Sequence, residues 1–115
     1  MLRIKAVLVL KRNATRDYLD FVALASQMSD EAISSALGRF DELYPQPNGE
    51  SALQQLEIQL ANPMPYDLEG VALGEYKNLA PRWHDWRAVK RACARLAVLI
   101  FEQSCRTNGG AKGQP

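Results

Sequence analysis

The stretch from Ala92 to Phe101 constrains the fold more than any other part of the chain. Nine of its ten residues are apolar, and Arg95 is the only charged one. It lies in a predicted helix over residues 82–105, whose apolar positions recur at helical spacing and share one face. These positions are Trp86, Val89, Cys93, Leu96, Ala97 and Ile100. A helix that is apolar almost all round must be covered almost all round, so the rest of the chain or a second subunit has to wrap it.

Three apolar residues of this helix fall outside its main apolar face. Val98 lies near the charged side that carries Arg95, and Leu99 and Phe101 lie on the two flanks. The chain has few elements with which to cover them, and large exposed apolar patches are rare on soluble monomers. We therefore predict that Arg95, Val98, Leu99 and Phe101 form the interface of a homo-oligomer, with a symmetric dimer as the commonest closed arrangement. Val98→Asp or Phe101→Asp is expected to dissociate such a dimer.

Two further helices are predicted from apolar residues spaced three and four positions apart. The first spans about residues 15–28, and the second starts after Ser29, a good N-cap residue, and ends before Pro45. Their apolar faces comprise Tyr18, Phe21, Val22, Ala25 and Met28 in the first helix, and Ile33, Ala36, Leu37, Phe40, Leu43 and Tyr44 in the second. The tight connection between them predicts an antiparallel or crossed helical pair.

The remaining segments leave two fold classes open. Residues 2–11 begin with alternating apolar residues and end in a continuous apolar run, which favours a buried strand. Residues 51–61 fit a helix and a strand equally well by spacing, and their Gln, Glu and Leu content favours a helix. We predict a mainly α fold of three to four helices with a short N-terminal strand. The alternative is an α+β fold with a small sheet from residues 2–11, 55–60 and 70–76.

Size and composition indicate one globular domain. The chain has 115 residues, of which 47% are hydrophobic and 23% charged, as is ordinary for a globular fold. We expect the domain to span residues 1–106 and residues 107–115 to form a flexible C-terminal tail. Cys93 and Cys105 lie too far apart on one helix to form a disulfide, which favours a reducing compartment. The N-terminal apolar run is too short for a signal peptide or a membrane span, so we predict a cytoplasmic protein with no membrane partner.

A ligand pocket is predicted where a long connection meets the start of the last helix. Residues 62–81 contain three prolines and two glycines, and long connections in compact domains are often functional. His84 is the only histidine, and two tryptophans flank it that could wall a pocket or stack on a planar ligand. The candidate ligand-binding residues are Tyr66, Arg82, Trp83, His84 and Trp86. The alternative interpretation places Trp86 in the core, Trp83 half-buried at the helix start and His84 on the surface.

Several other classes of site are not predicted. Residues 30–42 carry four acidic residues and one arginine, and the net charge of the chain is only +1, so specific binding of nucleic acid is not expected. Asp17 and Asp20 share a helix face, but we interpret them as solvated charges because no cofacial acid pair accompanies them. The sequence contains no zinc-type cluster, no phosphate-binding glycine loop and no nucleophile motif. We therefore predict no catalytic residues, no metal and no cofactor.

Two hypotheses for function follow from the sequence. The favoured one is a small cytoplasmic binding or interaction module that acts as a homo-oligomer and recognises a protein or small-molecule partner. The alternative is a small-molecule-binding protein or a small enzyme, with a pocket near Tyr66, Trp83, His84 and Trp86. A concavity beside His84 would favour the second hypothesis, whereas a solvated His84 with no concavity in reach would argue against it.

Overall fold

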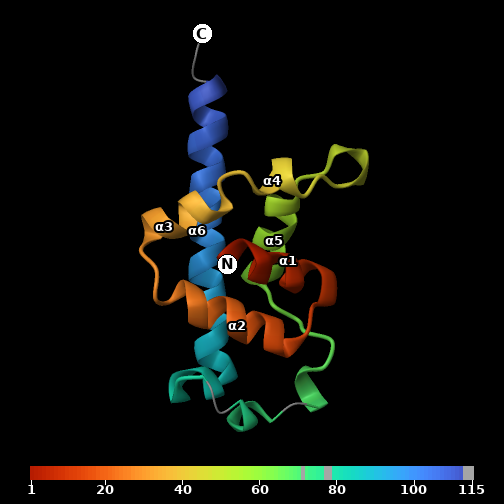
Figure 1. The fold of residues 1–115 in the computed structure, drawn as a ribbon, viewed down its shortest axis with the longest axis vertical. Coiled ribbons are helices and arrows are strands. Elements are labelled where there is room, and N and C mark those ends of the chain that lie inside the picture. The colour runs from red at the N-terminus through yellow and green to blue at the C-terminus, as the bar shows by residue number, and fades with distance from the viewer. Residues whose placement is uncertain (71, 77–78, 113–115) are drawn as a thin grey trace.

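The computed structural model describes residues 1–70, 72–76 and 79–112. Within these residues the fold is mainly helical and contains no strand. The longest element is α6 (Trp86–Lys112), which runs along the long axis of the molecule in Figure 1 and extends beyond the other helices at its C-terminal end. The protein is correspondingly elongated, with principal extents of 53, 30 and 22 Å. The prediction of a mainly α fold is therefore confirmed.

The N-terminal segment forms a helix, α1 (Leu2–Arg12), where we expected a short strand over residues 2–11. Ala6 and Val9 are both fully buried, and their spacing of three is the period of a helix and not of a strand. The helix ends at Asn13, whose φ of 49° places it in the left-handed region that terminates many helices. The predicted strand is wrong because the buried residues Leu2, Ala6 and Val9 recur at helical spacing, while Ile4 between them is exposed.

The two predicted helices after this segment are present with shifted boundaries. The first is α2 (Thr15–Ala25), and the second begins as α3 (Asp30–Leu37). Ser29 caps α3 as predicted, because its Oγ accepts a hydrogen bond of 3.1 Å from a backbone N–H in the first turn. The second helix stops early at Gly38, a poor helix former, and only the short α4 (Phe40–Leu43) follows.

The break after Gly38 redirects the chain toward the next helix. Phe40 turns inward and is fully buried. The following residue, Asp41, accepts one hydrogen bond of 2.7 Å from the Ser51 hydroxyl and one of 2.8 Å from the Leu53 N–H. The carboxylate of Asp41 thereby fixes α4 against the start of the helix that begins at residue 52.

The ambiguous segment 51–61 forms a helix, α5 (Ala52–Ala61), in agreement with the favoured prediction. Ser51 caps it by accepting a hydrogen bond of 3.0 Å from Gln54 N. Leu56 and Leu60 are fully buried, and α5 packs along α6. Because residues 55–60 are helical, the α+β alternative is wrong.

The connection between α5 and α6 contains short 3-10 turns instead of a strand. They are η2 (Leu68–Gly70), η3 (Leu73–Glu75) and η4 (Pro81–His84). The described residues of the 70–76 segment form no strand, and Val71 lies outside the described residues. In the parts of the chain that the structure describes, no helix is both long and apolar enough to cross a membrane.

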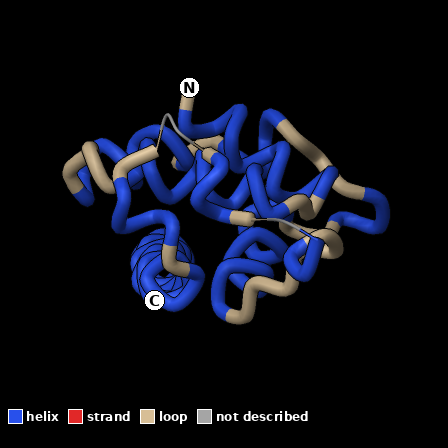
Figure 2. Tube along the Cα trace, turned by 90° about the horizontal axis from the view of Figure 1, so that it is seen from below, coloured by secondary structure: helices blue, strands red, loops and turns tan. Residues whose placement is uncertain are grey.

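The predicted apolar face of α6 is confirmed by burial. Val89, Cys93 and Ile100 are fully buried in the core that this helix shares with α1, α2, α3 and α5. Seen from below, the axis of α6 lies at one side of the molecule, and most of the remaining chain lies on the other side (Figure 2). The helix is therefore not wrapped on all sides by its own chain. It also continues past residue 106, where we expected the domain to end, as far as Lys112.

Candidate functional site

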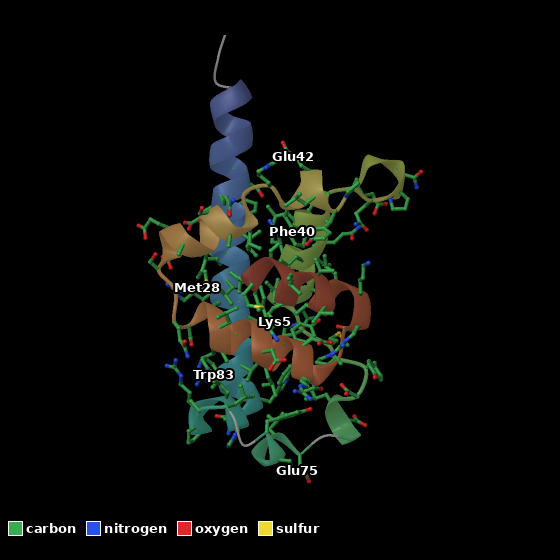
Figure 3. All side chains as sticks on the ribbon, in the orientation of Figure 1. Lys5, Met28, Phe40, Glu42, Glu75 and Trp83 are labelled. Atoms are coloured by element: carbon green, nitrogen blue, oxygen red, sulfur yellow. The ribbon has the colours of Figure 1, made fainter. Side chains whose placement is uncertain are left out.

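The five residues predicted to bind a ligand do not converge on one cavity. Trp83 is only 6% exposed and belongs to the core, with the guanidinium carbon of Arg82 4.5 Å from the centre of its rings. His84 is half-buried, and its Nε2 lies 3.0 Å from the carbonyl oxygen of Tyr76. Figure 3 shows Trp83 near the end of the molecule formed by the connection between α5 and α6. These three residues therefore pack this end of the fold together.

Tyr66 and Trp86 do share a concavity. It has a volume of about 580 Å³ and lies between residues 62–70 and the first turns of α6, where Lys90 also lines it. Tyr66 is 77% exposed, whereas Trp86 is half-buried and meets the ring of Tyr18 edge-on at a centroid distance of 6.4 Å. The structure thus brings together two of the five predicted residues and leaves the other three outside the lining.

A polar cluster that the sequence analysis missed joins α1, α2 and α5. We call it the α1–α2 junction; it consists of Arg12, Asn13, Asp17, Tyr18 and Gln59. Asp17 is 2% exposed and accepts two hydrogen bonds from the guanidinium of Arg12, at 2.7 and 3.2 Å. It also accepts one of 3.3 Å from Ala14 N at the start of α2. The interpretation of Asp17 as a solvated charge is therefore wrong.

The other half of the junction is a hydrogen-bonded chain from α5 to the end of α1. Gln59 Nε2 donates to the Val9 carbonyl oxygen and to the Tyr18 hydroxyl oxygen, both at 3.2 Å. Tyr18 in turn donates to Asn13 Oδ1 at 2.5 Å. Burial raises the pKa of the Tyr18 hydroxyl, which keeps it protonated as a donor. The junction is thus a satisfied structural network that locks three helices.

A neighbouring carboxylate extends this network to the connection after α5. Asp67 Oδ1 accepts hydrogen bonds of 2.8 Å from both the N–H and the hydroxyl of Thr15. The backbone hydrogen bond from Thr15 is the main reason why the pKa of Asp67 is lowered. Thr15 is fully buried, so this contact holds the connection against the N-terminus of α2.

A hollow of the surface lies between α5 and α6, and we call it the α5/α6 groove. It consists of two hollows of about 730 and 300 Å³ that share Glu57 and Phe101. The larger one reaches the turn between α3 and α4. The groove is lined by Gly38, Arg39, Phe40, Asp41, Glu42, Ser51, Leu53, Gln54, Glu57, Ala61, Ala94, Ala97, Val98, Phe101, Gln103, Ser104 and Cys105.

The four predicted interface residues divide between this groove and contacts within the chain. Val98 and Phe101 line the groove and are 57% and 53% exposed. Leu99 is 9% exposed, and Arg95 pairs with Asp30 of α3 at 2.9 Å. Helix α3 therefore covers one flank of α6, and the opposite flank stays open. The dimer itself stays a prediction.

The rim of the larger hollow is acidic. Asp41, Glu42 and Glu57 line it, with Arg39 as the single described cation. Arg39 is engaged by Glu42 at 2.7 Å. Figure 3 shows Glu42 outside the helices and Phe40 among the side chains between them, so α4 divides its residues between rim and core.

Two further features distinguish the groove from the core. Gln103 donates through Nε2 to the Ser34 carbonyl oxygen at 3.0 Å, but its Oε1 is buried and has no hydrogen-bond partner among the described residues. Cys105 is exposed at the groove, whereas Cys93 is buried, and burial raises the pKa of the Cys93 thiol to about 12. Cys105 is therefore the thiol that reagents reach in the folded protein.

The described residues contain no group of three His, Cys, Asp or Glu side chains that could hold a metal ion. The arrangement at the α5/α6 groove is instead an apolar floor with a charged rim.

Comparison with known proteins places most of the chain beside a segment of much larger transport proteins. It is 32% identical over 105 residues to the heme uptake protein MmpL11 of Mycobacterium tuberculosis. It is 29% identical to the mycolic acid-containing lipids exporter MmpL11 of Mycolicibacterium smegmatis and 27% identical to the probable transport protein MmpL11 of Mycobacterium leprae. Each match covers 90% of this chain, which spans only about a tenth of the length of these relatives. No protein-family model and no solved structure matches the chain.

This similarity corrects the functional prediction made from the sequence. We expected a small cytoplasmic binding or interaction module acting as a homo-oligomer, or alternatively a small-molecule-binding protein or enzyme. Nearly the whole chain instead corresponds to a segment of transport proteins. Composition and motifs could not reveal this, because amphipathic helices of this kind occur both in independent domains and in larger proteins.

Proposed function

We propose that this chain is a helical domain of an MmpL11-like transport system, equivalent to the matching segment of those proteins. The observation that carries the proposal is the 32% identity over 105 residues, which spans 90% of the chain. The relatives are a heme uptake protein and an exporter of mycolic acid-containing lipids, and these are the processes in which the domain would take part.

The fold is compatible with a supporting role in such a system. The buried polar groups of the α1–α2 junction hold the helices together, and the α5/α6 groove is open to solvent. In this proposal the domain acts by contacting other parts of the transport system, and the transported molecule is handled elsewhere.

A domain exchange in Mycolicibacterium smegmatis tests the proposal. The matching segment of its MmpL11 would be replaced by this chain, and export of mycolic acid-containing lipids would be measured in a strain that lacks the native exporter. We expect the chimera to restore most of the export that deletion of the segment removes. Leu56 is fully buried in α5, so Leu56→Asp should unfold the domain and reduce the chimera to the level of the deletion.

The segment could also act only as a spacer that holds its neighbours at the right distance. The control for this alternative is a chimera with an unrelated helical domain of similar length at the same position. Equal export with this control and with the chimera, at equal protein levels, would contradict the proposal. Normal export after deletion of the segment would contradict it as well.

We propose in addition that the domain lies on the cytoplasmic side. The support is chemical: both cysteines are free thiols, and Cys105 is exposed, as suits a reducing compartment. A membrane-impermeant maleimide should label Cys105 only after cells are permeabilised, and Cys105→Ser should abolish the signal. Labelling in intact cells would place the domain on the other side.

A further inference from the structure

We infer that the α5/α6 groove docks a basic amphipathic helix. The inference goes beyond the proposed function, because it names a surface and the chemistry of its partner. It is tested on the purified chain, so its failure would leave the proposed function intact.

The floor of the groove supplies apolar surface that this chain does not bury. Val98 and Phe101 lie one turn apart on α6 and are each more than half exposed, and Ala94 continues the same strip. An apolar strip of this kind in a groove between two helices is a common binding site for an amphipathic helix. Such a helix inserts its residues at positions i, i+3 or i+4, and i+7. Burial of the Phe101 ring would be the main source of affinity.

The rim of the groove selects the charge of the occupant. Glu57 lines the floor, and Asp41 and Glu42 line the larger hollow that also contains Phe101. Glu42 is paired with Arg39, and Asp41 accepts hydrogen bonds from Ser51 and Leu53, so the three carboxylates and one guanidinium leave this rim with a net negative charge. Glu57 is shared by both hollows and forms no ion pair with a described residue. Lysine or arginine side chains beside the apolar stripe of the occupant would meet these carboxylates, whereas an acidic helix or an anionic lipid surface would be repelled.

A third observation points to an occupant that donates hydrogen bonds. Gln103 Oε1 is buried at the groove without a partner among the described residues, although Nε2 of the same amide is bonded to Ser34. A buried acceptor without a donor is unfavourable, so a lysine or arginine N–H placed there would improve the complex.

A second copy of this chain is a poorer occupant. The basic residues at the start of α6 are Arg87, Lys90 and Arg91. The apolar residues next to them along the helix, Val89 and Cys93, are buried in the core of their own chain. This basic part of α6 therefore has no buried-type apolar stripe free to insert into the groove of a neighbour.

The test is fluorescence anisotropy with a labelled peptide of about 18 residues, five helical turns of leucine and lysine arranged as an amphipathic helix. We expect saturable binding at near-physiological salt. A peptide with glutamate in place of every lysine, and a peptide of scrambled order, should each bind at least about tenfold more weakly.

Variants of the chain locate the binding. Phe101→Asp should weaken it by at least about tenfold, and Glu57→Lys by about two- to fivefold, with the larger effect at low salt. Ile4→Asp is the matched control: Ile4 is 51% exposed on α1 and does not line the groove, so binding should stay unchanged. Val98→Asp provides a second groove variant in case Phe101→Asp does not fold.

Chemical modification gives a readout at the groove itself. Cys105 lines the groove, so bound peptide should slow its alkylation, whereas the scrambled peptide should not. Equal binding of the acidic peptide, or no effect of either groove variant, would overturn the inference. A dimer in sedimentation that Phe101→Asp dissociates would also overturn it, since a second copy would then occupy the groove.

Discussion

The α1–α2 junction and the α5/α6 groove both form where helices meet, yet they differ in how completely the chain satisfies them. In the junction, the Asp17 carboxylate and the Tyr18 hydroxyl both find partners within the chain. In the groove, Val98 and Phe101 stay more than half exposed and Gln103 Oε1 has no partner among the described residues. Buried polar groups that have hydrogen-bond partners stabilise the fold. Apolar side chains that stay exposed contribute little to stability, but they remain available for binding a partner.

Removal of a carboxylate from the junction should lower the stability far more than removal of a surface carboxylate. Asp17→Ala deletes the acceptor of two bonds from Arg12 and one from Ala14 N, so we expect the free energy of unfolding to fall by about 2–3 kcal/mol. Urea denaturation measures this fall. The control is Asp20→Ala, because Asp20 lies 3.7 and 3.8 Å from its basic partners and should cost no more than about 0.5 kcal/mol. If both variants lost the same free energy of unfolding, the buried junction would contribute no more to stability than a surface ion pair.

The contribution of Asp67 to stability should depend on pH, and we expect this effect to be smaller than that of Asp17→Ala. The pKa of Asp67 is lowered in the folded protein, so the unfolded chain binds this proton more readily. The stabilisation from Asp67 is therefore complete above its ordinary pKa of 3.8 and is lost as the pH falls through the lower folded value. Wild type should exceed Asp67→Asn in thermal stability at about pH 6, and the two should converge near about pH 2. A difference that stays constant with pH would contradict this assignment.

The smallest effect is expected in the groove. Phe101→Ser should change the free energy of unfolding by no more than about 0.5 kcal/mol, because the ring is 53% exposed and packs little. The adjacent Ile100 is fully buried, and Ile100→Ser should cost about 3–4 kcal/mol. Urea denaturation gives the free energy of unfolding of both variants, and so compares an exposed and a buried neighbour on the same helix. A large loss for Phe101→Ser would mean that the groove belongs to the core after all.

The sequence alone revealed the helices whose apolar faces are clear. The stripe of α6 and the Ser29 cap follow from spacing and residue type, and both are confirmed. The strand prediction for residues 2–11 is wrong because a short, continuous apolar run fits a buried strand and a helix equally well by composition. The break at Gly38 was missed because propensity is a weak signal beside a strong apolar pattern.

The sites were less predictable because they depend on contacts between distant residues. Thr15 and Asp67 are 52 positions apart, and no local pattern indicates that they meet. The groove requires that α5 pack along α6, while residues 51–61 were ambiguous between helix and strand. Exposure of Val98 and Phe101 did follow from the helical wheel, because no single face could hold all the apolar residues of α6.

The carboxylate of Asp41 also determines where the chain tolerates extra length. Because it holds both the Ser51 hydroxyl and the Leu53 N–H, the two ends of the excursion between α4 and α5 are pinned together at the base. The tip of this excursion, around Asn48 and Gly49, is exposed and projects away from the helices (Figure 1). Lengthening a pinned surface loop costs little conformational entropy, so an epitope or fluorescent protein could be inserted there. The inserted epitope or fluorescent protein would allow the protein to be located in cells without disturbing its core.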